Sequence, residues 1–505
     1  NAQASVTQTQ GGDLNERFWR EQLESRYYLT ARSWLGLKSI GEWNRKELAG
    51  DSLAANSYSF LEYQLFQGFG DTNTTFVELG FLQRYDDSVR TSDLQPFTYA
   101  YTFFGRSSWR TKQNGRLQVA AYYRNLQILQ PEEQSLQRTL TTRINFQQPF
   151  FDRALRWQSF YESGAGTEPR RSFTFIEVPA GTGTHTHIDY NGNGIRELDE
   201  FEIAPTPDLA TFVRVFSPNL EFVRTSSVKF GQTINLQAPN AWLSAKDGYK
   251  VWLQKFSMVS SYQLEQRTLL EGGLNELNPF RELSNDSLLV AESNAFRQSV
   301  FFNRSMLGFG AEYSFNRSAG RNLLTFGIEE RGLDAHRLGL RYGFDEHFVL
   351  RYQGQREDKR NRSGNFQSRN FDLGRWTQEM SLSYQQAQKL TLTGTFQYRD
   401  EMSTGANENA LLAQEYRMEV NYNLAKSVAL QSELAYIRND FEGDVNSPAA
   451  FEMLQAFKPG DNLSLNITLQ RTFLKNIVLS LNYAGRFSRE SFAIHTGNLQ
   501  VKAFL

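Results

Sequence analysis

A short loop near the middle of the chain carries the side chains best suited to bind a metal ion. The segment from Asp189 to Glu200 reads Asp-Tyr-Asn-Gly-Asn-Gly-Ile-Arg-Glu-Leu-Asp-Glu, which fits the Asp-x-Asn-x-Asn-Gly-x5-Glu pattern of calcium loops. Oxygens at the first, third and fifth positions, a backbone carbonyl at the seventh and a carboxylate at the twelfth would surround one hard cation. The pattern predicts a structural calcium site with the ligands Asp189, Asn191, Asn193, the Ile195 carbonyl and Glu200.

Two other interpretations of this loop stay open. It could be a Gly/Asn-rich turn that binds no ion, because no amphipathic helices flank it and because the hydrophobic Ile195 stands one position earlier than in helix-flanked loops. It could also be a regulatory calcium switch. Glu197 or Asp199 would serve as an auxiliary ligand in either calcium-binding form.

Other side chains with chemical potential form less complete groups. His185 and His187 could share a metal with a carboxylate, but two imidazoles without a third ligand more often are ordinary loop histidines. Arginines such as Arg341 and Arg417 recur at polar alternate positions, where they could attract anions or pair with carboxylates on neighbouring strands. The sequence has no serine nucleophile elbow, His-Glu-x-x-His site or phosphate loop, so we expect no enzyme.

The C-terminal stretch, residues 461–505, shows the clearest backbone pattern. Apolar residues occupy alternate positions, as in Leu463, Leu465, Ile467 and Leu469, with polar residues between them. A period of two is typical of a β-strand with one apolar and one polar face. Three such strands of roughly ten residues form an up-and-down meander, and this length suits tilted strands that cross a bilayer.

Three segments resemble parts of known outer-membrane proteins. Residues 497–505 read Gly-Asn-Leu-Gln-Val-Lys-Ala-Phe-Leu and look like the C-terminal targeting strand of bacterial outer-membrane proteins, which ends on an aromatic residue, although Phe504 is penultimate here. Residues 447–460 and 189–202 resemble segments of large, poorly characterised outer-membrane β-barrel proteins of Bacteroidota. The resemblance extends over most of the chain. It implies a location in the outer membrane and a chain that forms the C-terminal barrel region.

Composition agrees with a membrane barrel. Aromatic residues make up 14% of the 505 residues, yet the mean hydropathy of −0.54 is polar, as in a barrel with an apolar belt and a wet interior. No run reaches the ~18 apolar residues of a membrane helix, so spanning segments must be strands. With a net charge of −1 and no cysteine, we expect neither nucleic-acid binding nor disulfide or thiol chemistry.

The pattern along the whole chain predicts an all-β fold, a transmembrane antiparallel up-and-down β-barrel of about 20 strands (20–22, an even number) with long extracellular loops. Residues 1–25 are polar, and we expect them to form a linker or the remnant of an upstream region. We expect residues 26–505 to form the barrel. The alternation lapses at about 164–219, 265–299 and 439–462, which predicts extracellular insertions. Tight turns such as 345–347 alternate with longer connections such as 399–413, as periplasmic turns and outer loops should.

Two functions fit such a barrel. It could be a channel, translocation or transport component of the bacterial outer membrane, because a barrel of this size encloses a large lumen. Alternatively, it could be a non-conducting docking or scaffold subunit of a secretion, biogenesis or surface-display complex. The expected partners are outer-membrane lipid and, for the second function, other envelope proteins or lipoproteins.

Overall fold

Contacts divide the chain into two units, each described by itself. The computed structural model describes residues 2–11, 14–48, 52–90, 92–129, 136–242, 248–270, 278–280, 288–304, 308–324, 327–364, 366–387, 389–405, 408–424, 428–473, 477–489 and 492–503. Unit 1 comprises Asn1–Thr167, Arg224–Thr233 and Gln263–Leu288, and unit 2 comprises Glu168–Val223, Ile234–Tyr262 and Leu289–Leu505.

Unit 1 is built from long strands that pair with their neighbours in sequence. Antiparallel ladders join each strand from the first to the ninth. The strands are β1 (Ala2–Gly11), β2 (Leu14–Thr30), β3 (Ser33–Leu48), β4 (Tyr58–Gly70), β5 (Phe76–Arg90), β6 (Asp93–Arg110), β7 (Arg116–Ile128), β8 (Leu136–Phe150) and the first part of β9 (Leu155–Glu177).

Unit 2 continues the same antiparallel pattern from β14 to β24. Its strands are β14 (Leu289–Phe302), β15 (Phe309–Leu324), β16 (Gly327–Gly343), β17 (Phe348–Ser363), β18 (Phe371–Gln386), β19 (Leu390–Gly405), β20 (Asn409–Leu424), β21 (Val428–Glu442), β22 (Gly460–Phe473), β23 (Ile477–Ser488) and β24 (Ile494–Ala503). Parts of β12 (Phe212–Gln237) and β13 (Phe256–Leu269) also belong to it.

The remaining elements of unit 2 lie between strands. These are β10 (His185–His187), η1 (Leu198–Glu200), β11 (Phe201–Ile203), η2 (Pro207–Leu209), η3 (Asn240–Trp242), α1 (Tyr249–Leu253), η6 (Gln367–Arg369) and α2 (Pro448–Leu454). Within the described part of the chain, no helix is long and apolar enough to cross a membrane.

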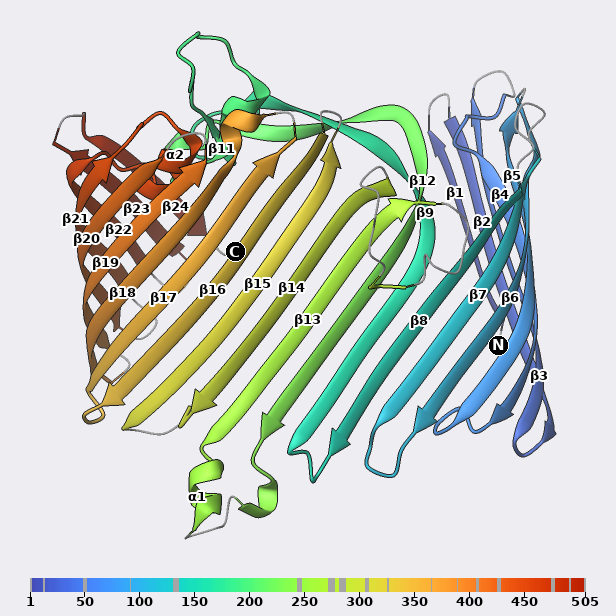
Figure 1. The fold of residues 1–505 in the computed structure, drawn as a ribbon. Helices are drawn as coiled ribbons and strands as arrows, with labels where there is room; N and C mark the ends of the chain where they lie inside the picture. Colours follow the sequence, from blue (N-terminus) through green and yellow to red (C-terminus); the bar gives the residue numbers. More distant parts are fainter. Residues whose placement is uncertain are drawn as a thin grey trace. The chain divides into compact units, whose positions relative to one another are not determined.

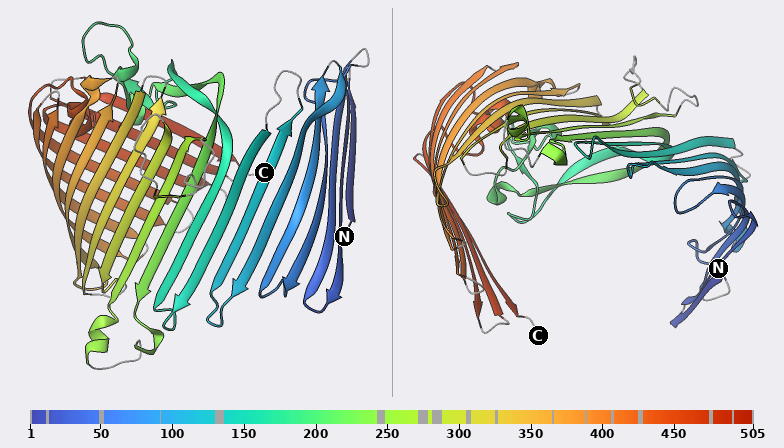
Figure 2. Two further views of the ribbon diagram at one scale, coloured as in Figure 1. Left: turned by 45° about the vertical axis from the view of Figure 1, so that its right-hand side comes forward. Right: turned by 90° about the horizontal axis from the view of Figure 1, so that it is seen from below.

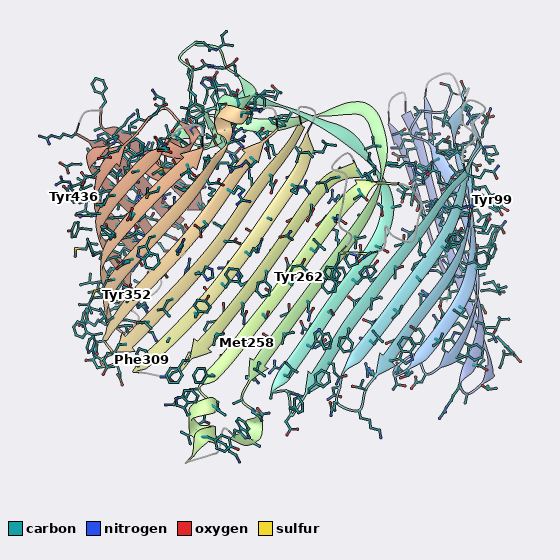
Figure 3. All side chains as sticks on the ribbon, in the orientation of Figure 1. Tyr99, Met258, Tyr262, Phe309, Tyr352 and Tyr436 are labelled. Atoms are coloured by element: carbon teal, nitrogen blue, oxygen red, sulfur yellow. The ribbon has the colours of Figure 1, made fainter. Side chains whose placement is uncertain are left out.

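The register gives the unit 2 sheet two chemically different faces. Residues directly opposite each other point to the same side, so Leu434 and Leu465 share one face while Glu433 and Asn466 share the other. We call these the apolar face and the polar face. Phe309, Tyr352 and Tyr436 lie on the apolar face (Figure 3). The sheet of unit 2 is curved (Figure 2).

The two ends of the unit 2 strands carry different connections (Figure 1). One end, called the turn end, has short connections such as 344–347 and 387–389, and also the longer segment 238–255 that contains α1. The opposite end, called the loop end, carries η6, α2 and the insertion between β9 and β12. The predicted alternation of tight turns and long loops is therefore found in this unit, with three exceptions: the long connection 238–255 at the turn end and the short connections 325–326 and 406–408 at the loop end.

In unit 1, aromatic side chains fill positions that glycines leave open. The Trp34 ring lies where Gly68 would carry a Cβ, and the Phe66 ring does the same at Gly36. Trp34 and Phe66 are buried together with Phe104, with exposed fractions of 1%, 2% and 5%. This cluster ties β3, β4 and β6 together through side chains as well as backbone hydrogen bonds.

The all-β prediction is confirmed, and the strand number agrees with its upper value. Of the 24 strands in the described residues, β10 and β11 have three residues each, and the other 22 are long. Closure of the strands into a barrel is considered under Proposed function.

The predicted linker at 1–25 is wrong. Residues 2–11 form β1, which pairs with β2 over Ala2 to Gly11, and β2 begins at Leu14. Strand pairing uses backbone hydrogen bonds, so a segment rich in Gln and Thr can join a sheet without the apolar content that packing in a core requires.

The predicted insertions keep their places but become shorter. Strands extend into each of them, so that the connections are 178–211, 270–288 and 443–459 in place of 164–219, 265–299 and 439–462. The connection predicted at 399–413 shrinks to 406–408. In all four cases the ladder continues past the point where the apolar alternation stops.

Some predictions fall outside the described residues. These are the parts of the second insertion at 271–277 and 281–287 and the terminal residues Phe504 and Leu505 of the predicted targeting strand.

Candidate functional site

The insertion between β9 and β12 folds around a small aromatic core. The rings of Phe175 and Phe201 stack 4.1 Å apart, and Phe212 meets Phe201 edge-on at 5.0 Å. Strand β10 pairs with β11, and His185 of β10 is also opposite Phe212 of β12. Phe201 and Phe212 are both 5% exposed. The segment is therefore a folded substructure and does more than connect two strands.

Two ion pairs anchor this insertion to distant strands of unit 2. Arg369 of η6, in the β17–β18 connection, lies 3.0 Å from the Glu202 carboxylate. Arg486 of β23 pairs with Asp208, and its guanidinium also donates to the Ala456 carbonyl at 3.2 Å. Because η6 and β23 belong to separate parts of the sheet, the insertion extends across the loop end on the concave side (Figure 2).

Helix α2 packs onto the polar face beside the insertion. Ser447 caps it, accepting a hydrogen bond from the Ala450 amide at 3.2 Å, and Pro448 occupies the first turn, where its missing N–H costs nothing. Met453 is fully buried. It belongs to an apolar cluster with Phe371, Leu373, Leu411, Ala413, Ala449 and Leu454.

The part of the polar face beneath α2 is apolar, unlike the rest of that face. Leu373 of β18 and Leu411 of β20 are apolar residues on the face that elsewhere carries charge, and they are 2% and 1% exposed because α2 covers them. A second tie is the ion pair of 2.6 Å between Lys359 of β17 and Glu452 of α2. We call residues 178–211 and 447–456 together the cap (Figure 1).

Farther along the same face is a buried network of charges. Glu401 is fully buried and lies 2.8 Å from Arg399 and 3.0 Å from Arg375, which in turn lies 3.1 Å from Glu357. The four residues come from β17, β18 and β19. A single unpaired charge at such a site would be costly, so the network requires all its partners.

A hollow of about 320 Å³ separates the cap from part of the polar face. Asp208 and Gln455 of the cap line it from one side, and Arg417, Glu433 and Arg486 line it from β20, β21 and β23. Guanidinium, carboxylate and amide groups are among those that line it, and Arg417 and Arg486 are already paired with Glu415 and Asp208. This chemistry suits a small polar solute better than a strongly charged one.

Hydrogen bonds among its own residues hold the loop from Asp189 to Glu200. Both carboxylate oxygens of Asp189 accept backbone hydrogen bonds, from Gly192 at 2.7 Å and Gly194 at 2.8 Å. The Asn191 amide donates to Glu197 at 2.6 Å, and the Asn193 amide does so at 3.4 Å. Asn191, Asn193 and the auxiliary Glu197 therefore lie together.

The Glu200 carboxylate contacts His187 and the backbone of Glu197. Its Oε2 lies 3.0 Å from His187 Nε2 and accepts the Glu197 amide at 3.2 Å, while its buried Oε1 has no partner. Ile195 is 62% exposed, and its amide donates to the Asn193 side chain. In the described part of the chain, no three His, Cys, Asp or Glu side chains are grouped to hold a metal.

Electrostatics inside the insertion follow burial and backbone hydrogen bonds. Amide groups of the loop, first of all that of Gly194, lower the pKa of the Asp189 carboxyl. Burial raises the pKa of Glu202, which Arg369 opposes, and burial beside Glu202 raises the pKa of Tyr190. Burial also lowers the pKa of His185, whose Nδ1 meets the Thr184 hydroxyl at 2.8 Å.

The arginines of the polar faces largely pair with nearby groups. Arg417 lies 2.7 Å from Glu415 and 3.7 Å from Glu419, and Arg143 lies 2.6 Å from Glu162. The predicted pairing across neighbouring strands is confirmed for Arg143 of β8, whose partner lies on β9, whereas both partners of Arg417 lie on its own strand, β20. The anchors Arg369 and Arg486 had no signal in the sequence, because their partners are more than 160 residues away along the chain.

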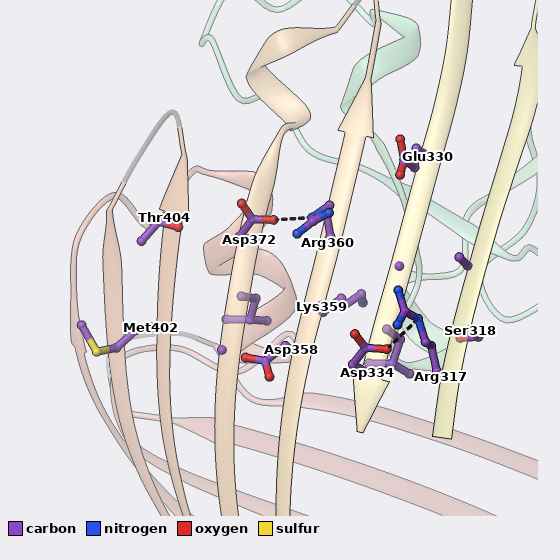
Figure 4. A pocket seen from close by; sticks show the side chains of 15 residues that line it. Arg317, Ser318, Glu330, Asp334, Asp358, Lys359, Arg360, Asp372, Met402 and Thr404 are labelled. Atoms are coloured by element: carbon purple, nitrogen blue, oxygen red, sulfur yellow. Dashed lines mark hydrogen bonds and ion pairs between the residues drawn. The ribbon is translucent and has the colours of Figure 1, made fainter. Parts of the chain in front are cut away.

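A second hollow, of about 530 Å³, lies on the apolar face (Figure 4). Gly332 and Gly374 leave its floor open. Its charged side chains pair with each other, Arg317 with Asp334 at 3.5 Å and Arg360 with Asp372 at 3.2 Å. This mutual pairing leaves few free charges for a ligand.

Comparison with known proteins adds no family. No family model matches the sequence, and no curated protein matches it. Among solved structures, the siderophore receptor PirA from Pseudomonas aeruginosa is 8% identical over 100% of this chain and 80% of that chain, with a TM-score of 0.36. The siderophore receptor PiuA from Acinetobacter baumannii is 11% identical over 98% and 82%, with a TM-score of 0.35. The outer membrane transporter YddB from Escherichia coli is 8% identical over 97% and 74%, with a TM-score of 0.36. All three TM-scores are low, so no conclusion about function rests on these structures.

Proposed function

We propose that this chain is an integral β-barrel of the bacterial outer membrane that passes a polar solute through its lumen, with the cap limiting that passage. The observation that carries the proposal is the separation of side chains by face in unit 2. The apolar face exposes Leu434, Met418 and Leu382 at 44%, 54% and 47%, whereas the opposite face carries charge. Exposed apolar rows opposite a polar face are what a lipid-facing barrel wall needs.

Barrel closure is part of this proposal. An even number of strands in an up-and-down meander brings the last strand back to the end of the sheet where the first began, so that β1 and β24 could pair and remove both edges. The resemblance of residues 497–505 to targeting strands of outer-membrane proteins supports the location.

The test of passage is conductance in planar lipid bilayers. The wild-type protein is compared with Asp208→Ala combined with Met453→Ala, which releases both parts of the cap. We expect a small conductance for the wild type and a larger one for the variant, with heat-modifiable migration unchanged. Absence of current in both, together with stable co-purification of other envelope proteins, would contradict passage and favour the docking function.

We also propose that the loop from Asp189 to Glu200 binds a structural calcium ion. The support is the set of oxygen-bearing residues at the expected spacing and the unpaired, buried Glu200 Oε1. Asp189, Asn191, Asn193, the Ile195 carbonyl and Glu200 would hold the ion, and Glu200 would exchange its contact with His187 for one with calcium.

Proteolysis tests this site separately from the barrel. Cutting between about Gly181 and Pro205 should accelerate on chelation, and Asp189→Ala with Glu200→Ala should remove the protection by calcium, because ligation offsets the entropy of ordering the loop. A His187→Gln variant serves as a matched control that keeps all proposed ligands. Protection that does not depend on calcium would show that the loop is only a turn.

A further inference from the structure

The longest turn-end connection of unit 2 has many more residues than the neighbouring connections at the same end. Segment 238–255 joins β12 to β13 and contains η3 and α1, whereas 303–308, 344–347 and 387–389 join their strands with only a few residues. A short turn suffices to reverse an antiparallel chain. The additional residues of this segment are therefore not needed to connect the two strands.

Helix α1 exposes large side chains. Tyr249 is 66% exposed, Trp252 58% and Leu253 37%. Trp242 of η3 packs edge-on against Tyr249 at 6.2 Å. Exposed aromatic residues this close together seldom face only water in a folded protein.

The exposed helix continues a row of aromatic residues on the apolar face. The Trp252 ring lies 4.5 Å from that of Phe256, Phe256 lies 5.0 Å from Phe302, and Phe302 lies 6.2 Å from Phe309. Phe309 shares its face with Tyr342, and these two are each 47% exposed. The row thus runs along the turn end of the apolar face and ends on α1 (Figures 1 and 3).

Lysines accompany this row. Lys250 is exposed on α1, and the Lys255 ammonium lies 6.0 Å from the centre of the Phe302 ring. A lysine can lay its methylene chain along apolar surface while its charge reaches lipid phosphate. Tryptophan, tyrosine and lysine together are typical of the boundary between hydrocarbon and headgroups.

We propose that α1 is an interfacial anchor that lies in the lipid headgroup layer at the turn end and fixes the depth of the neighbouring strands in the membrane. The proposal rests on the membrane-barrel function proposed above. Its occupant is the lipid surface because the exposed side chains of α1 extend the apolar face directly and are flanked by lysines that suit phosphate. Insertion of Trp252 and Tyr249 would bury their rings while leaving the indole N–H and phenol hydroxyl near polar groups.

The absence of cysteine allows a clean test with single nitroxide labels. The protein is reconstituted in vesicles of phosphatidylethanolamine and phosphatidylglycerol, with a label at Leu253→Cys, at Glu346→Cys in a short turn of the same end, or at Leu479→Cys on the apolar face. Collision rates with oxygen, which concentrates in lipid, and with a nickel chelate, which stays in water, are measured for each label. A label in the headgroup layer should collide with nickel several-fold less often than the Glu346 label, while retaining access to oxygen.

The variant Tyr249→Ala with Trp252→Ala should raise the nickel collision rate at position 253 to that of position 346, with position 479 unchanged. Equal rates at 253 and 346 in the parent protein, with 479 in hydrocarbon, would overturn the anchor while leaving the membrane barrel intact. Protection of position 253 from both reagents would mean burial within protein and would also overturn it. A water-exposed label at 479 would instead contradict the membrane barrel itself.

Discussion

At the scale of single residues, the structure assigns the charges of the polar face to networks that join neighbouring strands. Glu401 is the centre of one such network because it lies between Arg399 and Arg375 and is fully buried. A buried carboxylate stabilises a fold only while its cationic partners are present.

Replacement of Glu401 by Gln should therefore be strongly destabilising. It removes the paired carboxylate from the buried Arg399 guanidinium and leaves Arg375 with Glu357 alone, and the expected loss is about 3–5 kcal/mol. The matched control is Asp400→Asn, because Asp400 is the next residue on β19 and is exposed on the opposite face. Unfolding in urea after reconstitution compares the two, and equal effects would contradict the buried network.

The anchor between Arg369 and Glu202 should respond to pH. Burial raises the pKa of the Glu202 carboxyl above its ordinary value of 4.5. Because the folded pKa is the higher one, the stability that this group contributes is fully present below 4.5 and is lost as pH rises through the raised folded pKa. Hydrogen exchange of residues 185–203, corrected for intrinsic rates, should therefore speed up over this window. Glu202→Gln should abolish the trend, and an unchanged trend would show that another group is responsible.

The residues proposed to bind calcium show what could and could not be predicted from sequence at this scale. The spacing of Asp189, Asn191 and Asn193 can be read from the sequence because the proposed ligands lie in one local loop. The contact of Glu200 with His187 was not, because it depends on how β10 and β11 pair.

At the scale of elements, α2 is the part of the cap whose own stability can be adjusted. It has only seven residues, too few to be stable alone in water. Its helical form therefore depends on the hydrogen bond from the Ala450 amide to the Ser447 side chain and on the apolar cluster around Met453.

Two substitutions should release α2 without unfolding the strands. Ser447→Ala removes the side-chain hydrogen bond at the N-terminus of α2 and should cost about 1 kcal/mol of helix stability. Met453→Ala leaves a cavity in the apolar cluster and should cost about 2–5 kcal/mol. Hydrogen exchange should increase in 448–454 while β20 and β21 keep their protection. Loss of protection in the strands as well would show that α2 is an integral part of the sheet.

Sequence reasoning identified this segment as a loop element and the strands around it, but erred at element ends. The lapse of alternation at 439–462 indicated a loop there and no spanning strand, and α2 lies within this connection. In contrast, β19 ends only at Gly405 and β20 already begins at Asn409, so both strands extend into the connection predicted at 399–413. Backbone pairing continues there although the outward side chains are no longer apolar. Leu373 and Leu411 did not predict α2 from the sequence, because an apolar residue on the polar face can pack against a helix, a loop or another strand.

At the scale of the whole molecule, the two faces of the strands should differ in tolerance to charge. An arginine at mid-strand costs about 2–4 kcal/mol when it faces hydrocarbon but much less when it faces water. Ile467→Arg and Leu479→Arg should thus lower barrel stability, whereas Asn466→Arg and Ser480→Arg on the polar face should have small effects. Heat-modifiable migration in detergent, read as a shift in the unfolding temperature, compares the four variants. Equal sensitivity of the two faces would be inconsistent with a membrane wall.

The most direct test of the membrane-barrel account is a scan of single labelled cysteines along β22, from Asn462 to Gln470, in lipid vesicles. A lipid-phase quencher and an aqueous quencher are applied to each label. The account predicts a period of two, with labels at Leu463, Leu465, Ile467 and Leu469 quenched from the lipid and those at the intervening positions quenched from water. Aqueous quenching at every position, or quenching without alternation, would contradict it.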